Sequence, residues 1–230
     1  MSHFDYGYFS FSKKKPKETN YKLDRKKLSK QRGIKNRILA NELDHEFYDG
    51  NRLNGYGGFK YDGRWKKFLK KIIKKYKLDK NSRVLDISAK KGFFMHDLSL
   101  LIPGIKIYGI EDHKYPIQNA MKSVKNDIRY VNSYCDIKFK KDYFDFVHAH
   151  NAIYRYSLKD LITIIRIISK ISKESHITVP AYNKEIERSK FLDWTLLGGV
   201  IFTKKEWIKL FKELDYEGDY YFSGAESYGL

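Results

Sequence analysis

Two hydrophobic periodicities divide the chain into predicted strands and helices. Short runs of apolar and β-branched residues predict six buried strands, at residues 83–87, 105–110, 128–131, 144–149, 175–179 and 218–222. Apolar residues at i, i+3 and i+4 predict the intervening helices, at residues 64–76, 93–101, 115–124, 158–168, 183–197 and 204–214. This alternation predicts an α/β fold: a Rossmann-like, doubly wound, mainly parallel sheet of six to seven strands with helices on both faces and an N-terminal arm.

Single residues refine these boundaries. Ser157 and Thr203 each stand three positions before an acidic residue, which is typical of a capping box at the start of a helix. Pro180 is expected to end the fifth strand, because proline has no N–H to donate to a sheet. Gly33 weakens the helix that a partial apolar stripe predicts for residues 23–43.

Residues 1–54 are predicted to form an arm or lid over a main domain at residues 55–230. The arm begins with five aromatic residues, Phe4, Tyr6, Tyr8, Phe9 and Phe11. A segment dense in Lys, Arg and Asn follows them. The aromatic cluster indicates docking onto another surface, for which a homodimer through the arm is one candidate. A partly disordered basic tail is the alternative.

Composition limits the class of protein. A chain of 230 residues can hold one α/β domain with a sizeable core. The formal charge of +18 would suit nucleic acid, but 36 Lys against 10 Arg, together with abundant Ile, Asn, Tyr and Phe, indicates the bias of an AT-rich genome. A nucleic-acid partner is therefore not favoured, although a charged substrate stays open. The lysines of residues 64–76 are interpreted as the solvated face of a helix.

Cysteine content and hydropathy predict the cellular setting. Cys135 is the single cysteine, so one chain can form neither a disulfide nor a cysteine zinc site, which fits a reducing, cytoplasmic location. No run approaches about 18 apolar residues, the length needed to span a membrane. The N-terminus also lacks an apolar signal segment. We therefore expect a soluble protein.

Residues 82–112 indicate a binding site. Strand, tight turn at Gly92, helix and second strand follow one another as a βαβ unit, and Pro103-Gly104 ends the helix. In such a unit the turn and the helix N-terminus face a crevice, and an acid that ends the second strand can accept hydrogen bonds from a ribose. Glu111 and Asp112 stand at that point. The dinucleotide fingerprint G-x-G-x-x-G is absent.

Several motifs resemble those of class I S-adenosylmethionine (SAM) dependent methyltransferases. DISAKKG at residues 86–92 is similar to the family's first motif, an Asp followed by a Gly-rich turn. Further motifs resemble a bacterial subgroup linked to surface-polysaccharide and small-molecule pathways: GYGGFKYDGRW (55–65), FDFVHAHN (144–151), FLDW (191–194) and FTKKEWIKLFKELDYEGDYYF (202–222). The resemblance implies SAM as cofactor and a small-molecule or sugar-linked substrate. Only eight residues follow the last strand, which leaves little room for the reversed seventh strand of many relatives.

The resemblance also implies cofactor contacts. Glu111 aligns with the ribose-binding acid of the family, and Asp86 with the acid that orients the backbone or the methionine ammonium. Ser133 or its neighbour Asn132 could bond the adenine amino group, where many relatives carry an acid. The predicted cofactor-binding residues are Asp86, Ser88, Gly92, Glu111, Asp112, Ser133 and Asn151.

The turn departs from the family pattern. Ser88, Ala89 and Lys90 stand where the family is rich in glycine, and their side chains narrow the space for a close backbone approach. Lys90 and Lys91 also bring two ammonium groups near a positively charged sulfonium. Either the lysines point to solvent or cofactor affinity is reduced.

Two histidines are candidates for catalysis. His148 and His150 share one face of the fourth strand, and either could act as general base for an oxygen or nitrogen nucleophile. A histidine that only packs in the wall is an alternative of equal weight. Two histidines without a third ligand do not indicate a metal site, so none is predicted.

The substrate side is predicted from a glycine-rich loop and from the residues after the fourth and fifth strands. The loop at residues 50–65 is expected to close over a ligand, and an ordinary linker packed on the sheet edge is the alternative. Arg155 is the candidate for an anionic substrate group. The predicted substrate-binding residues are Tyr56, Tyr61, Arg64, Tyr154, Arg155 and Tyr182.

The predicted function is therefore SAM-dependent methylation of a small-molecule or sugar-linked substrate. Two other functions stay open. One is a degenerate, non-catalytic binding or regulatory subunit, because of the altered turn. The other is an RNA methyltransferase that uses the positive surface.

Overall fold

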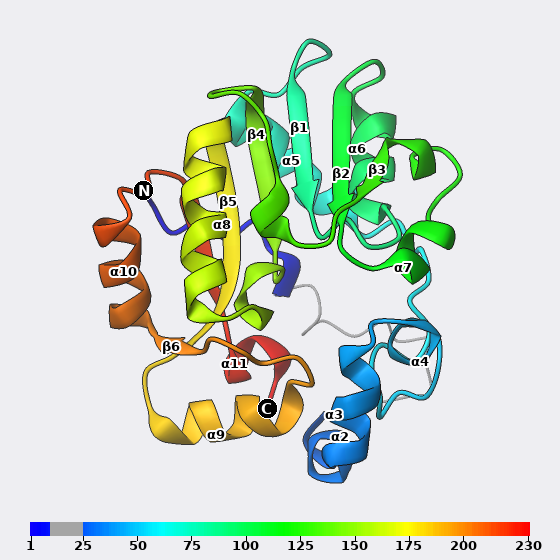
Figure 1. The fold of residues 1–230 in the computed structure, drawn as a ribbon, viewed down its shortest axis with the longest axis vertical. Helices are drawn as coiled ribbons and strands as arrows, with labels where there is room; N and C mark the ends of the chain where they lie inside the picture. Colours follow the sequence, from blue (N-terminus) through cyan, green and yellow to red (C-terminus); the bar gives the residue numbers. More distant parts are fainter. Residues whose placement is uncertain (10–24) are drawn as a thin grey trace.

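The centre of the fold is one parallel sheet. A computed structural model describes residues 1–9 and 25–230. Its strands are β1 (Arg83–Ile87), β2 (Lys106–Glu111), β3 (Ile128–Tyr130), β4 (Phe144–His150), β5 (Ser172–Tyr182), β6 (Phe202–Thr203) and β7 (Asp219–Ser223). They lie in the order β3-β2-β1-β4-β5, and both β7 and β6 pair with β5. All these pairs are parallel, so the predicted α/β architecture is confirmed (Figure 1).

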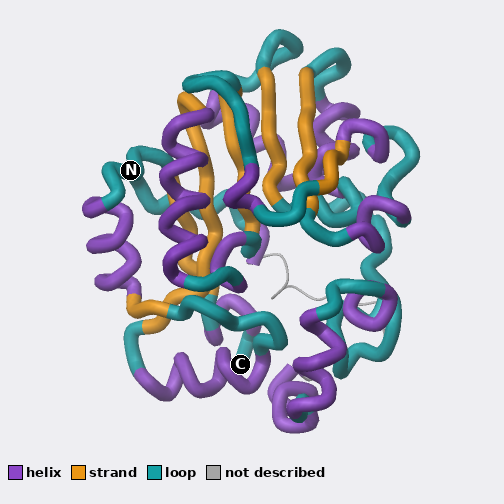
Figure 2. The backbone as a smooth tube through the Cα atoms, viewed as in Figure 1, coloured by secondary structure: helices purple, strands orange, loops and turns teal. Residues whose placement is uncertain are grey.

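Helices cover both faces of the sheet. The α-helices are α2 (Arg25–Gln31), α3 (Ile34–Asn41), α4 (His45–Tyr48), α5 (Trp65–Tyr76), α6 (Phe93–Leu101), α7 (Lys114–Gln118), α8 (Leu158–Ile171), α9 (Glu185–Trp194), α10 (Lys204–Glu213) and α11 (Ala225–Tyr228). Single 3-10 turns are η1 (Lys125–Asp127), η2 (Tyr134–Asp136) and η3 (Ile153–Arg155). The apolar side chains of α8 and α10 form one core with the sheet, and those of α5 and α6 form a second. Figure 2 shows helices and loops gathered beyond one end of the strands, where α2–α4, α9 and α11 form a cap.

The helix predicted at residues 64–76 buries the apolar stripe that its sequence pattern indicates. In α5 the side chains of Trp65, Phe68, Leu69 and Ile72 are buried, whereas most of its lysines are exposed. Burying each large apolar side chain contributes about 1.5–3 kcal/mol before conformational entropy is subtracted. The lysines therefore form the solvated face of a packed helix, as predicted.

Two predicted boundaries are wrong. The helix expected at residues 115–124 ends at Gln118, because the Asn119 side chain bonds the Tyr115 carbonyl and the Met121 N–H donates to Lys91 O instead of continuing the helix. Pro180 does not end β5, which continues to Tyr182. Pairing of β5 with β4 stops at Thr178, two residues before the proline. On that edge of β5 the missing N–H of Pro180 therefore breaks no hydrogen bond between strands.

The end of the sheet beyond β5 carries two unexpected features. β7 is parallel to β5, and no strand among residues 1–9 and 25–230 runs in the reverse direction. The outer edge of β7 is then covered by the N-terminus. Tyr220 N–H donates to Ser2 O at 3.0 Å, and Phe4 N–H donates to Tyr220 O at 2.9 Å. The amino-terminal segment thus protects an edge that would otherwise be open to other chains.

The region predicted as an arm contains separate helices. Gly33 separates α2 from α3, where it is the N-cap residue of α3. Leu28 of α2 packs on Phe191 and Trp194 of α9, which joins this region to the carboxyl-terminal helices. The predictions for Phe11 and for the basic residues 13–17 lie outside the described residues. Along the part of the chain that the structure describes, no helix is both long and apolar enough to cross a bilayer.

Candidate active site

A cavity of about 410 Å³ lies at the carboxyl ends of β1, β2 and β4. This volume is within the range of about 300–1,000 Å³ that is usual for small-ligand sites. One wall comes from the strand ends and the turn after β1, and the other from the cap and the glycine-rich loop. The predicted site residues that line it are Asp86, Ser88, Glu111, Asn151, His148, His150, Tyr56, Arg64, Tyr154 and Arg155.

Five predicted site residues lie elsewhere. The Tyr61 hydroxyl donates to Asp97 Oδ1 of α6 at 2.5 Å, and Tyr182 stands at the end of β5, outside the cavity lining. Ser133 caps η2 by accepting from Cys135 N–H at 3.1 Å. Gly92 packs against Val124, and Asp112 lies behind Glu111 in an ion pair.

The turn after β1 has left-handed backbone angles at two residues that are not glycine as well as at Gly92. Ser88 and Lys90 have φ angles of 63° and 54°, and Gly92 has a φ of 74°. The left-handed region costs a non-glycine residue roughly 1–2 kcal/mol. The turn is held by hydrogen bonds from the N–H groups of Ser88 and Ala89 to Ile110 O, at 2.9 and 3.1 Å. The surrounding structure therefore maintains this conformation against the local preference of its residues.

The two lysines of the turn have different environments. Lys91 is buried, and its Nζ lies 2.8 and 2.6 Å from the two carboxylate oxygens of Asp49. Although burial opposes it, hydrogen bonds from Lys91 and Tyr115 lower the pKa of Asp49. Lys90 instead lines the cavity. Only one ammonium group of the predicted pair is therefore left near a cationic cofactor.

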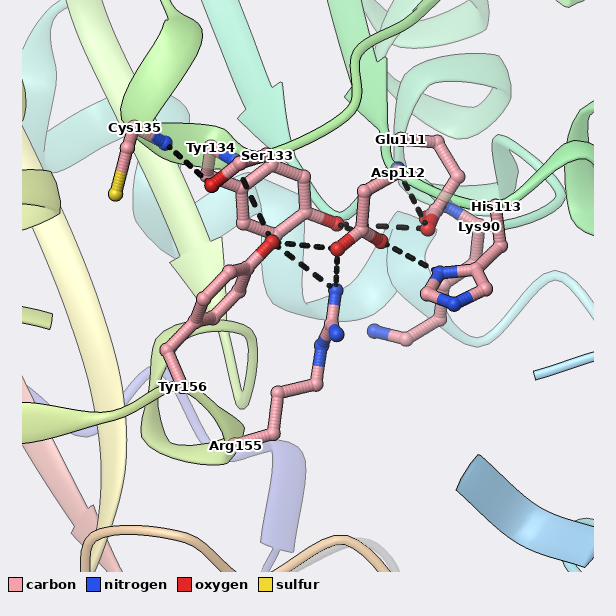
Figure 3. A network of polar contacts seen from close by, with 9 residues as sticks. All are labelled: Lys90, Glu111, Asp112, His113, Ser133, Tyr134, Cys135, Arg155 and Tyr156. Atoms are coloured by element: carbon pink, nitrogen blue, oxygen red, sulfur yellow. Dashed lines mark hydrogen bonds and ion pairs between the residues drawn. The ribbon is translucent and has the colours of Figure 1, made fainter. Parts of the chain in front are cut away.

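Two adjacent carboxylates at the end of β2 form the centre of a polar network (Figure 3). Glu111 Oε2 accepts from the Lys90 N–H at 2.8 Å, and Asp112 is bonded by the Arg155 guanidinium and the Tyr156 hydroxyl. The Tyr134 hydroxyl donates to Asp112 Oδ1 at 3.2 Å. Glu111 is almost fully buried, with 1% of its surface exposed.

The network separates the pKa values of the two carboxyl groups. Burial and the neighbouring Asp112 charge raise the pKa of Glu111 to about 7. Burial opposes ionisation of Asp112 as well, but His113 and Arg155 hold the pKa of that carboxyl well below its usual range. Asp112 thus carries the negative charge, and Glu111 takes up a proton near neutral pH. Arg155, which the sequence suggested for an anionic substrate group, is paired with Asp112.

The two candidate catalytic histidines belong to a buried chain of hydrogen bonds. His148 Nδ1 lies 2.8 Å from Asp86 Oδ1, and its Nε2 lies 3.5 Å from the Tyr6 hydroxyl. The same hydroxyl lies 2.6 Å from His150 Nδ1. Burial, followed by the nearby His148, lowers the pKa of His150 well below its usual value. Burial therefore holds the His150 imidazole in its neutral form and makes it a weak base.

Tyr6 was missed as a site residue by sequence reasoning. The only signal was the aromatic cluster at the N-terminus, from which we predicted docking onto a surface. In the structure Tyr6 is 3% exposed and packs against Trp65, Phe68 and His148 of its own chain. Homodimer formation through this segment stays a prediction.

One group in the described part of the chain brings three potential metal ligands together, within 4.8 Å of one another: Glu111, Asp112 and His113. Asp112 already accepts from Arg155 and Tyr134, and His113 Nδ1 lies 2.8 Å from Asp112 Oδ1. Protein contacts therefore already occupy both Asp112 oxygens and His113 Nδ1.

Comparison with known proteins supports the fold. No protein-family model and no curated protein matches the sequence. A SAM-dependent methyltransferase from Archaeoglobus fulgidus aligns at 15% identity and a TM-score of 0.51, over 65% of this chain and 68% of that one. Another from Methanosarcina mazei aligns at 17% identity and a TM-score of 0.50, over 62% of this chain and 82% of that one.

The YcgJ protein of Bacillus subtilis aligns at 17% identity and a TM-score of 0.49, over 64% of this chain and 66% of that one. The sheet order, the turn and the position of the cavity, together with these alignments, show that the chain has the fold of class I SAM-dependent methyltransferases.

Proposed function

We propose that the protein transfers a methyl group from SAM to a small molecule. The observation that carries this proposal is the position of Glu111. Its buried carboxyl group ends β2, lines the cavity and holds the left-handed turn through Lys90 N–H. A carboxylate at this point of a βαβ unit is suited to accept the hydroxyls of a ribose.

The rest of the cavity also fits the cofactor. A sulfonium is favoured by carboxylates and by aromatic faces, and Asp86, Tyr8 and Tyr56 line the cavity. Lys90 is the one feature of the turn that opposes a cation. When bound, SAM supplies an electrophilic methyl group, and the protein must provide orientation and a route for one proton.

His150 is the residue that we propose as proton acceptor. Its imidazole lines the cavity and is neutral, so it can take the proton of an oxygen or nitrogen nucleophile. Tyr6 orients the ring through Nδ1, and Asp86 orients the neighbouring His148. The proposed role requires the tautomer in which Nδ1–H donates to the Tyr6 hydroxyl, because Nε2 then has the lone pair that accepts the proton.

A small molecule is supported over a macromolecule by the shape of the site. Residues of the cap, including Leu43 and Phe47, stand opposite the sheet across the cavity, and Trp194 and Leu196 extend this wall. We propose that residues 1–54 act as a lid over the site. Membership of the polysaccharide-pathway subgroup, a sugar-linked substrate and a cytoplasmic location stay proposals on the same footing.

Titration calorimetry with SAM and with its demethylated product tests the proposal. Saturable binding of both ligands is expected. No detectable heat up to millimolar ligand would contradict it and would favour the degenerate, non-catalytic subunit. RNA binding that weakens steeply with salt, combined with methyl transfer to RNA, would instead favour the RNA methyltransferase.

A further inference from the structure

Three arginines of the cap surround one tryptophan in the wall of the cavity. The guanidinium carbons of Arg25, Arg32 and Arg52 lie 6.0, 4.2 and 5.3 Å from the centre of the Trp194 ring. All four residues line the cavity that also contains Glu111 and His150. The arginines come from the start of α2, from the residue after it, and from the loop that follows α4.

No carboxylate among the described residues pairs with these arginines. Their hydrogen bonds go to main-chain carbonyls: Arg25 to Tyr228 O, Arg32 to Trp194, Arg52 and Gly55 O, and Arg52 to Gly55 O. Arg32 is 9% exposed, and its buried Nε has no partner. Burial and the adjacent arginines lower the pKa of Arg32 to about 9 and that of Arg52 to about 10. The site therefore concentrates positive charge that no carboxylate among residues 1–9 and 25–230 neutralises.

Helix capping explains only part of this cluster. Arg32 bonds Trp194 O, and Arg37 bonds Leu192 and Thr195 O, so both neutralise the carboxyl end of α9. Arg37 does this without lining the cavity. Arg25 and Arg52 make no contact with the end of α9 through hydrogen bonds, yet both line the cavity. Arg25 instead bonds the carbonyl of Tyr228, the last residue of α11, whereas Arg52 bonds Gly55 O within its own loop and caps no helix. Both add positive charge to the cavity lining.

We propose that Arg25, Arg32 and Arg52 bind a phosphate group of the methyl acceptor, so that the substrate is a phosphorylated or nucleotide-linked small molecule. This inference rests on the proposed function. A single carboxylate is satisfied by one guanidinium fork, whereas the several oxygens of a phosphate or diphosphate can accept from three. The Trp194 ring is buried and packs against the guanidinium groups, which holds them in place beside the cavity. Arg155 is excluded from this role because Asp112 neutralises it.

The test uses the full chain with inorganic phosphate and pyrophosphate as probes, measured by calorimetry and by Trp194 fluorescence. Arg25→Gln and Arg52→Gln are each expected to weaken binding of the probes at least tenfold. Arg37→Gln is the matched control, since it removes an arginine of the same cluster outside the cavity, and it should bind the probes like the unaltered protein. Thermal unfolding of each variant checks that the fold is retained. Substitution of Arg25 is expected to disturb the fold least, because this residue is half-buried at the start of α2.

Three outcomes would overturn the inference. The unaltered protein fails to bind either probe, or Arg37→Gln weakens binding as much as Arg52→Gln, or acetate and succinate displace pyrophosphate at equal concentration. Binding of the demethylated cofactor is measured in the same preparations. Loss of cofactor binding with intact phosphate binding contradicts the proposed methyltransferase function, whereas the reverse pattern contradicts only the phosphate site.

Discussion

The two walls of the cavity differ in their charged groups and in the parts of the chain that supply them. The sheet wall contains Asp86 and Glu111, which come from one βαβ unit of the chain. The cap wall contains Arg25, Arg32 and Arg52, which three separate segments contribute. Carboxylates on the sheet wall are each bonded by the protein, whereas the hydrogen bonds that the arginines make with described residues all go to main-chain carbonyls. The difference suggests that the sheet wall holds a cationic cofactor and the cap wall an anionic acceptor.

The largest expected effect is on turnover, and it tests the proton acceptor rather than the binding of cofactor or phosphate. His150→Ala should lower turnover about 10²- to 10⁴-fold, because it removes the group that accepts the proton. Turnover is measured as release of the demethylated cofactor with a phosphorylated acceptor that the unaltered protein methylates. Tyr6→Phe, which keeps the ring but removes the hydroxyl bonded to His150, should cause a smaller loss. Full turnover in His150→Ala would show that the histidine is only a wall residue.

The second effect tests whether the walls act independently. Glu111→Gln should weaken binding of the demethylated cofactor by about 10- to 100-fold, as expected from the roughly 1.5–3 kcal/mol of hydrogen bonds to a charged group. Binding of pyrophosphate should stay unchanged, because the cap wall is left intact. Calorimetry measures both affinities. Unchanged cofactor affinity would mean that the ribose is not held by Glu111.

The third effect is a pH dependence confined to the sheet wall. Glu111 must be ionised to accept two ribose hydroxyls, and its pKa is raised to about 7. Cofactor affinity should therefore increase about tenfold between pH 6 and pH 8, where one proton is lost. The stability of the free protein should change in the opposite direction. A raised carboxyl pKa favours the folded state below the unfolded value of 4.5, and this contribution is lost as the pH rises towards 7.

The matched control for this pH dependence is Glu111→Gln. The variant carries no titrating group at position 111, so its weak cofactor affinity should vary little between pH 6 and pH 8. A profile that keeps its slope in this variant would assign the titration to a group other than Glu111.

The smallest effect concerns the strained turn. Ser88→Gly and Lys90→Gly should each stabilise the fold by about 0.5–1 kcal/mol, because both positions have positive φ angles. Ala89→Gly in the same turn should destabilise it by a similar amount, since Ala89 is buried without a positive φ. Denaturant unfolding measures the three differences. If all three glycine substitutions lower the free energy of unfolding by the same amount, the left-handed geometry stores no strain.

Much of the fold could be predicted because its determinants are local. Apolar runs marked the strands, the stripe of α5 marked a packed helix, and Ser157 and Thr203 do cap α8 and α10. Six of the ten predicted site residues that line the cavity lie at or just after the carboxyl ends of parallel strands, which meet at one edge of the sheet. The other four reach it from the glycine-rich loop and from η3: Tyr56, Arg64, Tyr154 and Arg155. Where prediction failed, pairing with a remote segment decided the outcome: the Met121 N–H donates to Lys91 O instead of continuing a helix, and β5 continues past Pro180 beside β7 and β6.

The sequence by itself determined the order of strands and helices and the place of an acid at the end of β2, because periodicity and chain order carry that information. Only the tertiary structure decided the charge state of the cavity. Arg155 is neutralised by a carboxylate 43 positions away, and Tyr6 reaches a histidine 144 positions away. Three arginines remain without a carboxylate among the described residues. Such pairings depend on distances between remote segments, and no local pattern of residues encodes them.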